Sequence, residues 1–411
     1  MKCCVAQLGS RMHYAVPRIL HGSGSLERLY TDIVAAKGPA AMLRFIPDGM
    51  KPAGIKALSD RVPEGVPCDM IETFDLFALG YFFRRSSARS REENTNVNLR
   101  AGRSFCGLVV RSGLGRADTV YAFQSAALEI FRHAGEKGIR CVLEQTIAPR
   151  SVETDLLSKE QERFPGWFSG DYGNAADAEY SIREKAEWLK SDLIVCGSEF
   201  VKEGMISCGV LPDRIVVVPY GVSRPEYRPS EGNTYREPPL HVLFAGTAGI
   251  RKGIGDLSEA VRLLPRGTAE VRAVGSIALT PSGVRAAGRW ITFLGRVQRS
   301  RMVEQYRWSH VFVLPTICEG SAAVIYEALA EGLPVVTTAN AGSIVRDGKD
   351  GFIVPVRSPG KIAEKLSFLA NNPDVVAEMS CNARARSREF TVERYGERLL
   401  DALKRRPEEP V

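Results

Sequence analysis

Long apolar runs are missing from this chain of 411 residues. No stretch approaches the roughly 18 consecutive apolar residues of a membrane-spanning helix, and the segment from Met1 to Gln7 is too short to hold the apolar core of a secretory signal. No low-complexity tract dominates, which argues against disorder, collagen-like repeats and coiled coils. We therefore expect a globular protein of the cytoplasm.

Cysteine and histidine are present but are not spaced as metal ligands. The nine cysteines are scattered without a C-x-x-C pair, which argues against both a disulfide framework and a zinc site. The five histidines form no close pair, and D-x-D does not occur. The strings G-x-S-x-G, Walker A and a helix-opening G-x-G-x-x-G are missing too. We expect neither a metal nor a cofactor, so any chemistry must come from positioning and charge.

The chain carries a formal net charge of +7. This modest excess suits an anionic small ligand or a membrane surface as well as nucleic acid. Because nothing in the sequence resembles an established nucleic-acid-binding module, we expect no nucleic-acid partner.

Strand-like and helix-like segments alternate along the chain, which predicts parallel, doubly wound α/β domains. At about 100–200 residues per domain, the length predicts two domains. We place the first over residues 1–222 and the second over residues 223–390, because the polar segment 221–239 is typical of a linker. A C-terminal helix over about 391–411 is expected to pack back on the first domain.

The expected strands of the second domain are 241–246, 270–274, 291–294, 311–314, 334–338 and 351–355. Those of the first domain are 42–46, 108–110, 119–122, 140–143 and 193–196, with a further strand at 216–220. The segment LERLYTDI (26–33) has the spacing of a helix.

The segment from Pro315 to Val336 has the strongest functional pattern. Glu319 follows an expected strand, and Glu327 lies eight residues later inside the helix that begins next. The amino terminus of that helix predicts an anion site, because its first amides lack intrahelical acceptors. The small residues that permit close approach there are Gly320, Ser321, Ala322 and Ala323. The alternative is that Glu319 is an acid that merely favours the amino terminus of the helix and that Glu327 is a solvent-facing helix residue.

This string, EGSAAVIYEALAEGLPVV from Glu319, resembles the donor-site signature of the retaining glycosyltransferases of family 4, the glycosyl transferases group 1 family. VFVLPT precedes it and GSIVRDGKDGFIVP (342–355) follows it, and the likeness covers residues 240–390 and, more loosely, 191–222. The resemblance implies a GT-B fold, with two Rossmann-like domains facing a central cleft. It also implies that Glu319 contacts the hydroxyls of the donor sugar and Glu327 those of the ribose.

The resemblance implies a metal-independent hexosyltransferase. Its donor would be a UDP- or GDP-sugar, and its acceptor a hydroxyl of a glycan, a lipid-linked molecule or a small molecule. Lys252 and Gly253 match the family's diphosphate-binding KG, and Arg251 is the candidate to supply the cation that is missing at Thr247, so Arg251, Lys252 and Glu319 are the candidate catalytic residues. Further donor contacts are implied at Gly246, Thr247, Gly295 and Val297. Thr247 is a departure, because many relatives have arginine at that position.

On the acceptor side, Gly22 and Gly24 leave backbone accessible, as the family's first cleft-facing loop does. Glu144 stands in LEQTIAPR (143–150), where many relatives have a histidine near the transferred sugar. Orientation of the acceptor and a purely structural hydrogen-bonding role are both open for this glutamate.

The segment 74–103 sets large apolar residues beside six arginines. This combination favours an anionic interface, either a phosphorylated acceptor or a membrane at its cytoplasmic face; the alternative is a buried helix followed by a solvated loop. Two other functions share the expected fold: a GT-B nucleotide-sugar epimerase or phosphorylase, and a non-catalytic nucleotide-sugar-binding or membrane-associated protein.

Overall fold

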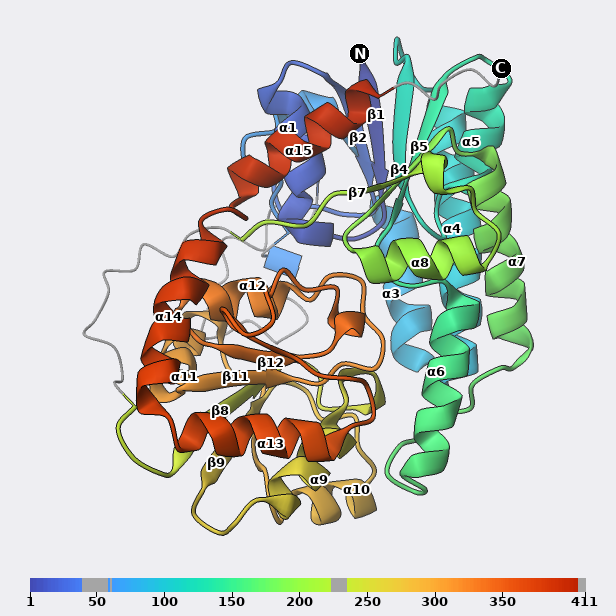
Figure 1. The fold of residues 1–411 in the computed structure, drawn as a ribbon. Coiled ribbons are helices and arrows are strands. Elements are labelled where there is room, and N and C mark those ends of the chain that lie inside the picture. Colours follow the sequence, from blue (N-terminus) through green and yellow to red (C-terminus); the bar gives the residue numbers. More distant parts are fainter. Residues whose placement is uncertain (39–57, 60, 223–234, 406–411) are drawn as a thin grey trace.

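The computed structural model describes residues 1–38, 58–59, 61–222 and 235–405. It contains two separate parallel sheets with helices on their faces, one above the other in Figure 1. The predicted α/β class with two doubly wound units is confirmed. The strand expected at 42–46 and most of the expected linker lie outside the described residues.

The first sheet has seven strands in the order β3-β2-β1-β4-β5-β6-β7. Along β4 (Thr119–Phe123), Val120 and Ala122 enter the core on one face of the sheet, and Tyr121 and Phe123 enter the core on the other face. Both faces are therefore covered, as parallel sheets require. The other strands are β1 (Cys3–Gln7), β2 (Leu26–Thr31), β3 (Ile71–Thr73), β5 (Arg140–Gln145), β6 (Leu193–Cys196) and β7 (Ile215–Val217).

Two predictions in the first domain are wrong. The segment expected to begin a helix at Leu26 is strand β2, which pairs with β1 and β3; its apolar residues happen to match helical spacing. The strand expected at 108–110 lies inside a 22-residue helix, α4. The helices here are α1 (Ala15–Gly22), α3 (Asp75–Ser87), α4 (Arg91–Ser112), α5 (Leu128–Gly135), α6 (Arg150–Arg163), α7 (Ala175–Lys190) and α8 (Glu199–Ser207).

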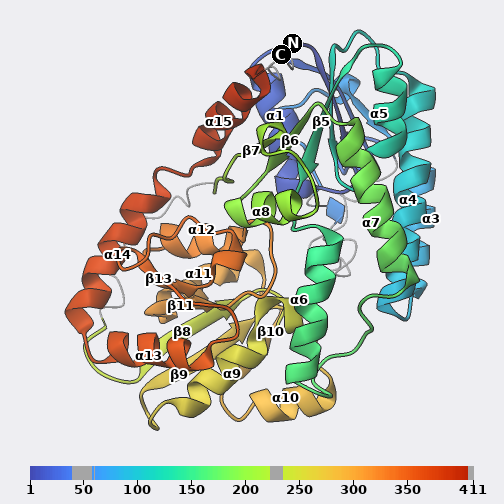
Figure 2. The same cartoon turned by 45° about the vertical axis from the view of Figure 1, so that its right-hand side comes forward.

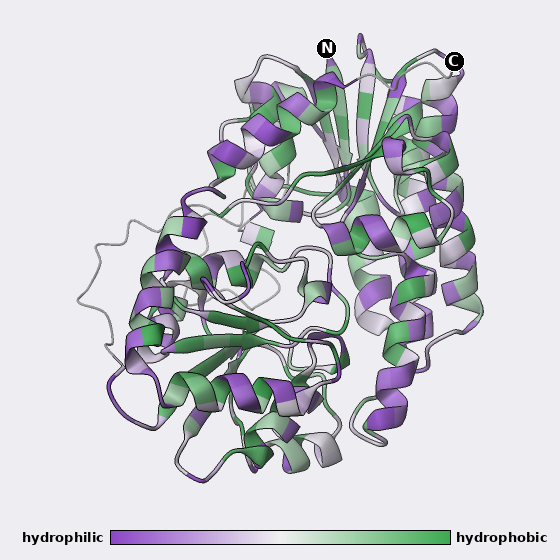
Figure 3. Cartoon of the chain, viewed as in Figure 1, coloured by the Kyte–Doolittle hydropathy of each residue, from purple (hydrophilic) through white to green (hydrophobic). Residues whose placement is uncertain are grey.

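The second sheet has six strands in the order β10-β9-β8-β11-β12-β13, and each lies within two residues of its predicted bounds. In Figure 3 these strands are drawn largely in the hydrophobic colour. The strands are β8 (Leu240–Ala245), β9 (Ala269–Val274), β10 (Thr292–Gly295), β11 (Val311–Leu314), β12 (Val335–Thr337) and β13 (Gly351–Ile353). The helices are α9 (Ile254–Leu263), α10 (Pro281–Ala287), α11 (Met302–Trp308), α12 (Ala323–Ala330), α13 (Pro359–Ala370) and α14 (Pro373–Ser387).

Strand order reverses beside β1 in the first sheet and beside β8 in the second. In open α/β sheets a ligand crevice forms outside the carboxyl ends of the strands at such a reversal. The topology therefore places a binding site at β1 and β4 in one domain and at β8 and β11 in the other.

Two helices join the domains. The last helix, α15 (Val392–Lys404), lies against α1, and its Tyr395 and Leu399 enter the core of the first domain beside Val5 (Figure 1). Helix α6 crosses the other way, because it follows β5 in sequence but runs alongside the second domain in Figure 2.

The crossing of α6 is fixed by packing and charge. Leu157 and Phe164 lie in the core of the second domain. A Cβ at Gly255 would lie 2.6 Å from the Phe164 ring, so α9 can approach that ring only with a glycine there. Arg163 Nη2 lies 2.7 Å from Asp256 Oδ1, a carboxylate with a side-chain exposure of 1%. The sequence does not predict that α6 packs on the second domain.

Among the described helices, none combines the length and the apolar character needed to cross a bilayer.

Candidate active site

A cavity of about 600 Å³ lies between the carboxyl ends of the two sheets. Its lining from the first domain comes mainly from the loops after β1, β4 and β5 and from the helices α3, α4, α6 and α7. From the second domain it takes the turn after β8 and the loop after β11. Both strand-order reversals therefore meet at one cavity, which is lined by 24 residues including Arg251, Glu319, Gly320 and Ser321.

Three predicted catalytic residues come together here: Arg251 and Glu319 line the cavity, and Lys252 contacts Glu319 from behind its wall. Lys252 Nζ donates to Glu319 Oε1 at 3.0 Å, and Arg251 Nη2 lies 3.4 Å from Glu319 Oε2. The Lys252 and Glu319 side chains are mostly buried, whereas that of Arg251 is 42% exposed. Burial lowers the pKa of the Lys252 amine, and the charge of Glu319 opposes that change. Two cations thus share one carboxylate.

Backbone contacts hold the two loops in register. Gly253 has φ +70°, and a Cβ there would lie 1.9 Å from the carbonyl oxygen of Pro315. Only glycine lets the turn after β8 approach the end of β11 this closely. The amide of Ile317 then donates to the carbonyl of Arg251 at 2.9 Å. The positions of Arg251 and Glu319 are therefore set by the backbone as well as by their ion pair.

The small residues before α12 contact the first domain. A Cβ at Gly320 would lie 1.8 Å from the carbonyl oxygen of Thr146, so a larger residue would separate the domains. Ser198 Oγ donates to the Gly320 carbonyl at 2.5 Å. Ser321 is buried and hydrogen-bonds to the hydroxyl of Tyr326 at 2.8 Å. Gly320 and Ser321 therefore join the two domains at the cavity.

The amides at the start of α12 are only partly free. The amide of Ala322 donates to the carbonyl of Ala341 at 3.0 Å, so it is already occupied. The helix begins at Ala323 without a side-chain cap. The amide of Ile325 donates to the carbonyl of Ala322 at 2.9 Å, so the amides of Ala323 and Val324, with the positive end of the helix dipole, are the candidate donors for an anion.

Glu327 is half-buried on α12, and Tyr306 on α11 donates to its Oε2 at 2.9 Å. The hydroxyl fixes the carboxylate while leaving Oε1 as an acceptor. The alternative of a free solvent-facing glutamate is therefore wrong for this residue.

The other predicted donor residues lie at the carboxyl ends of neighbouring strands. Gly246 follows β8 with φ +128°, and its carbonyl approaches Gly275 too closely for any Cβ there. Gly275 donates in turn to the carbonyl of Gly295 at 2.8 Å. Thr247 Oγ1 lies 3.0 Å from Ser276 Oγ, and Val297 packs partly buried on the core.

Glu144 lines the cavity, and both of its oxygens are occupied. Tyr121 donates to Oε2 at 2.7 Å and Tyr220 to Oε1 at 3.0 Å. Its residue exposure is 1%, and burial raises the pKa of its carboxyl group. This arrangement favours the structural hydrogen-bonding role that the sequence left open.

Gly22 and Gly24 do not face the cleft, contrary to the prediction. Gly22 ends α1 and Gly24 lies in the turn before β2, at the amino-terminal edge of the sheet. The prediction failed because β1 was not identified as the first strand. The loop that enters the cavity is the one after β1, where Gly9 donates to Asp32 Oδ1 at 3.1 Å.

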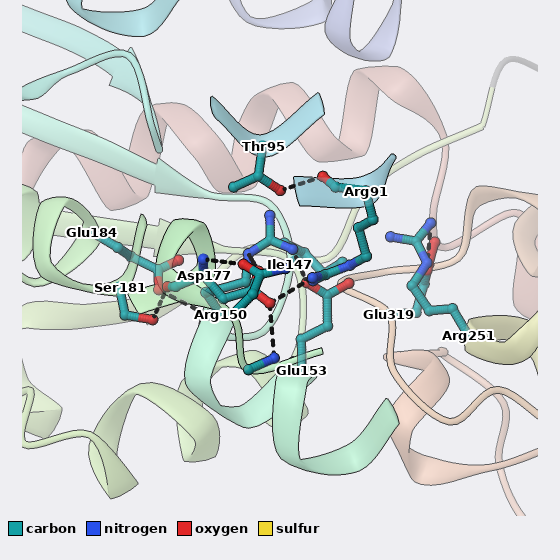
Figure 4. Close-up of polar contacts among 12 residues, drawn as sticks. Arg91, Thr95, Ile147, Arg150, Glu153, Asp177, Ser181, Glu184, Arg251 and Glu319 are labelled. Atoms are coloured by element: carbon teal, nitrogen blue, oxygen red, sulfur yellow. Dashed lines mark hydrogen bonds and ion pairs between the residues drawn. The ribbon is translucent and has the colours of Figure 1, made fainter. Parts of the chain in front are cut away.

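A cluster of charged residues on the first domain was not predicted. Arg150 at the start of α6 lies 2.8 Å from Glu153 and stacks on Tyr180, with its Cζ 4.3 Å from the ring centroid. Arg91 Nη1 binds Asp177 Oδ2 at 2.5 Å beside it. Figure 4 shows this cluster next to the pair formed by Arg251 and Glu319. These residues come from three helices and share no motif.

Among the described residues, two cavity arginines hydrogen-bond only to neutral groups. Arg11 Nη1 donates to Thr146 Oγ1 at 3.1 Å, and Arg85 Nη1 donates to the hydroxyl of Tyr81 at 3.4 Å. The first-domain side of the cavity therefore offers two guanidinium groups that form no ion pair with another described residue. Within the described part of the chain, no three His, Cys, Asp or Glu side chains gather as a metal site.

Comparison with known proteins agrees with this geometry. Residues 239–372 match the family described as "Glycosyl transferases group 1". The D-inositol 3-phosphate glycosyltransferase of Xylanimonas cellulosilytica is 31% identical over 257 residues, which cover 55% of this chain and 61% of that protein. Its counterpart from Streptomyces scabiei is 29% identical over 204 residues, covering 44% and 46%. The chain thus spans about half the length of these curated relatives.

Solved structures are similar over nearly the whole chain. Sucrose-phosphate synthase from Thermosynechococcus elongatus superposes with a TM-score of 0.65 at 16% identity, covering 98% of each chain. HepE from Anabaena, solved with UDP and glucose, gives 0.58 at 15% identity and covers 98% of this chain and 99% of its own. The chain therefore has the GT-B fold, and residues 239–372 of its second domain are similar to the group 1 glycosyltransferases.

Proposed function

We propose that this protein is a retaining glycosyltransferase that moves a hexosyl group from a UDP- or GDP-sugar to a hydroxyl acceptor. The observation that carries the proposal is the meeting of Arg251 and Lys252 with Glu319 at the wall of a cavity shared by both domains, which Arg251 and Glu319 line. The family match and the UDP-containing neighbour support a nucleotide-sugar donor. Glu319 would bind the hydroxyls of the sugar, and Glu327 those of the ribose.

The diphosphate would lie between the two cations and the amides of α12. Its negative charge competes with Glu319 for Arg251 and Lys252, which frees the Glu319 carboxylate to accept hydrogen bonds from sugar hydroxyls. As the bond between the anomeric carbon and the phosphate oxygen breaks, charge grows on the leaving diphosphate. Fixed cations stabilise that charge most in the transition state.

The reaction needs no protein nucleophile. The acceptor oxygen bonds to the anomeric carbon on the face that the diphosphate leaves, and the acceptor proton passes to the departing phosphate oxygen. Configuration is retained, and no metal takes part. Contact of both domains around the cavity would exclude water that could hydrolyse the donor.

The charge on the first-domain side of the cavity favours an acceptor that carries an anionic group as well as the reacting hydroxyl. Arg11 and Arg85 have neutral partners, so an incoming phosphate or carboxylate would gain their charge without displacing a carboxylate. The two curated relatives named above are inositol 3-phosphate glycosyltransferases, which is consistent with an acceptor of this class. We place the reaction in the cytoplasm; the nine free cysteines support a reducing compartment.

A panel of UDP- and GDP-sugars tests the proposal. A ligand that binds the native state raises the melting temperature, so one nucleotide series should stabilise the protein. The stabilising sugar is then incubated with phosphorylated and unphosphorylated polyols, and the product is analysed by mass spectrometry. Transfer with retained configuration supports the proposal. Binding without transfer to any acceptor favours a non-catalytic sensor, and free-sugar isomerisation favours an epimerase.

A further inference from the structure

Helix α3 exposes large apolar side chains on the face that would ordinarily be polar. Leu76 is 89% exposed, Leu79 49%, Phe82 58% and Phe83 64%. Leu76, Leu79 and Phe83 follow the spacing i, i+3, i+7 and so share one face, with Phe82 beside them. We call these four residues the α3 stripe. A contiguous apolar patch of this kind marks a surface that meets another apolar phase.

The opposite face of α3 already has its packing partners. Phe77 lies 6.3 Å from the Phe105 ring of α4 and stacks on Tyr81 at 6.1 Å, and Ala78 is buried. Figure 2 shows α3 beside α4 at the outer edge of the first domain. The α3 stripe is therefore the outward face of a helix whose inward face is already packed.

Positive charge follows the stripe at the carboxyl end of the helix. Arg84 and Arg89 are exposed, and neither forms an ion pair within the described ranges. The carboxylate of Glu93 lies nearby, but the bond it accepts comes from the backbone amide of Arg89. Cations without partners beside exposed aromatic and leucine side chains are complementary to an anionic lipid surface, which offers phosphate groups above an apolar interior.

We propose that α3 docks the protein on an anionic lipid surface, with the α3 stripe in the interfacial layer and Arg84 and Arg89 on the headgroups. The same helix supplies Tyr81 and Arg85 to the cavity lining. Docking would therefore bring the acceptor side of the cavity to the membrane, where a lipid-linked hydroxyl acceptor resides. Vesicle binding needs no sugar transfer, so this inference can fail or hold independently of the proposed reaction.

Vesicle flotation tests the proposal with the full chain. The wild type should float with phosphatidylcholine vesicles that contain roughly 30% phosphatidylglycerol, and much less with phosphatidylcholine alone. Leu76→Ser/Phe83→Ser should reduce the bound fraction at least about tenfold, because two interfacial anchors are lost. Arg84→Gln/Arg89→Gln should weaken binding and lessen its dependence on salt.

A matched control replaces equally exposed apolar residues elsewhere. Leu211 is 60% exposed and Leu263 52%, so Leu211→Ser/Leu263→Ser should float like the wild type. Melting temperature and nucleotide binding are measured for every variant, and Phe83→Ser alone serves if the double variant is unstable. The proposal is overturned if the wild type does not bind anionic vesicles or if the stripe variant binds as well as the control. It is also overturned if the stripe variant instead abolishes a dimer of this chain, because the stripe would then serve a second copy.

Discussion

Lys252 Nζ and Glu319 Oε1 lie 3.0 Å apart, and this contact joins the turn after β8 to the loop after β11. The two side chains come from different strands of the second sheet and meet where its strand order reverses. A bound diphosphate would compete with Glu319 for Lys252. The pair therefore affects both the stability of the ligand-free protein and the binding of the donor.

The first prediction separates the effect of this pair on stability from its effect on sugar transfer. Glu319→Gln should lower the free energy of unfolding by about 2 kcal/mol, because it leaves Arg251 and Lys252 side by side without a carboxylate. The double variant Lys252→Met/Glu319→Gln should recover most of that loss. Transfer should fall at least about a hundredfold in each variant, because a diphosphate cation or a sugar ligand is gone. Recovery of transfer in the double variant would contradict the assigned roles.

Tyr306 provides the second prediction, because its hydroxyl fixes Glu327 at 2.9 Å. Tyr306→Phe should raise the donor KM about tenfold with little change in kcat, since the hydrogen bond acts equally in the ground and transition states. Tyr235→Phe is the control: Tyr235 donates to the carbonyl of Ala370 at 2.7 Å in the buried core, so its loss should affect stability alone. Equal KM values for the two variants would remove the case for Glu327 as a ribose ligand.

Helix α6 provides the third prediction. Arg163→Ala leaves the buried Asp256 without its cation, so urea denaturation should show a loss of about 3 kcal/mol. Lys159→Ala is the control on the same helix, because its pair with Asp155 is more than half exposed and should be worth less than about 1 kcal/mol. Similar losses in both variants would mean that α6 does not bind the second domain as described.

Buried acids beneath the cavity provide the fourth prediction. Burial raises the pKa of Glu184 to about 7 from an ordinary value near 4.5. Between these values the folded carboxyl keeps its proton while the unfolded one loses it, so the folded state binds more protons and stability falls as pH rises. Glu184→Gln removes this titration. The free energy of unfolding of the wild type should therefore fall more steeply than that of Glu184→Gln from pH 5 to 7, and parallel curves would contradict the assignment.

Much of the second domain could be predicted from sequence. Each of its strands is a short apolar run between turn signals, and the donor-side residues from Glu319 to Glu327 are contiguous. Local pattern is informative here because one loop and one helix hold Glu319, Glu327 and the small residues between them.

The first domain was less predictable for a physical reason. β2 lies between β1 and β3, and the apolar residues at 26, 29 and 30 within it and at 33 just after it fit a helix as well as a strand. Arg11, Arg85 and Arg150 reach the cavity from three separate segments, so no motif unites them. The passage of α6 into the second core depends on tertiary contacts such as that of Phe164 on Gly255, which leave no local pattern.

A crystal structure with a bound UDP- or GDP-sugar tests the central claim most directly. The account predicts that the diphosphate lies within hydrogen-bonding distance of Lys252 Nζ and the first amides of α12. It also predicts that the sugar hydroxyls bind Glu319 and the ribose binds Glu327. A nucleotide sugar bound away from the loop between β11 and α12, with the Lys252–Glu319 pair intact, would contradict it.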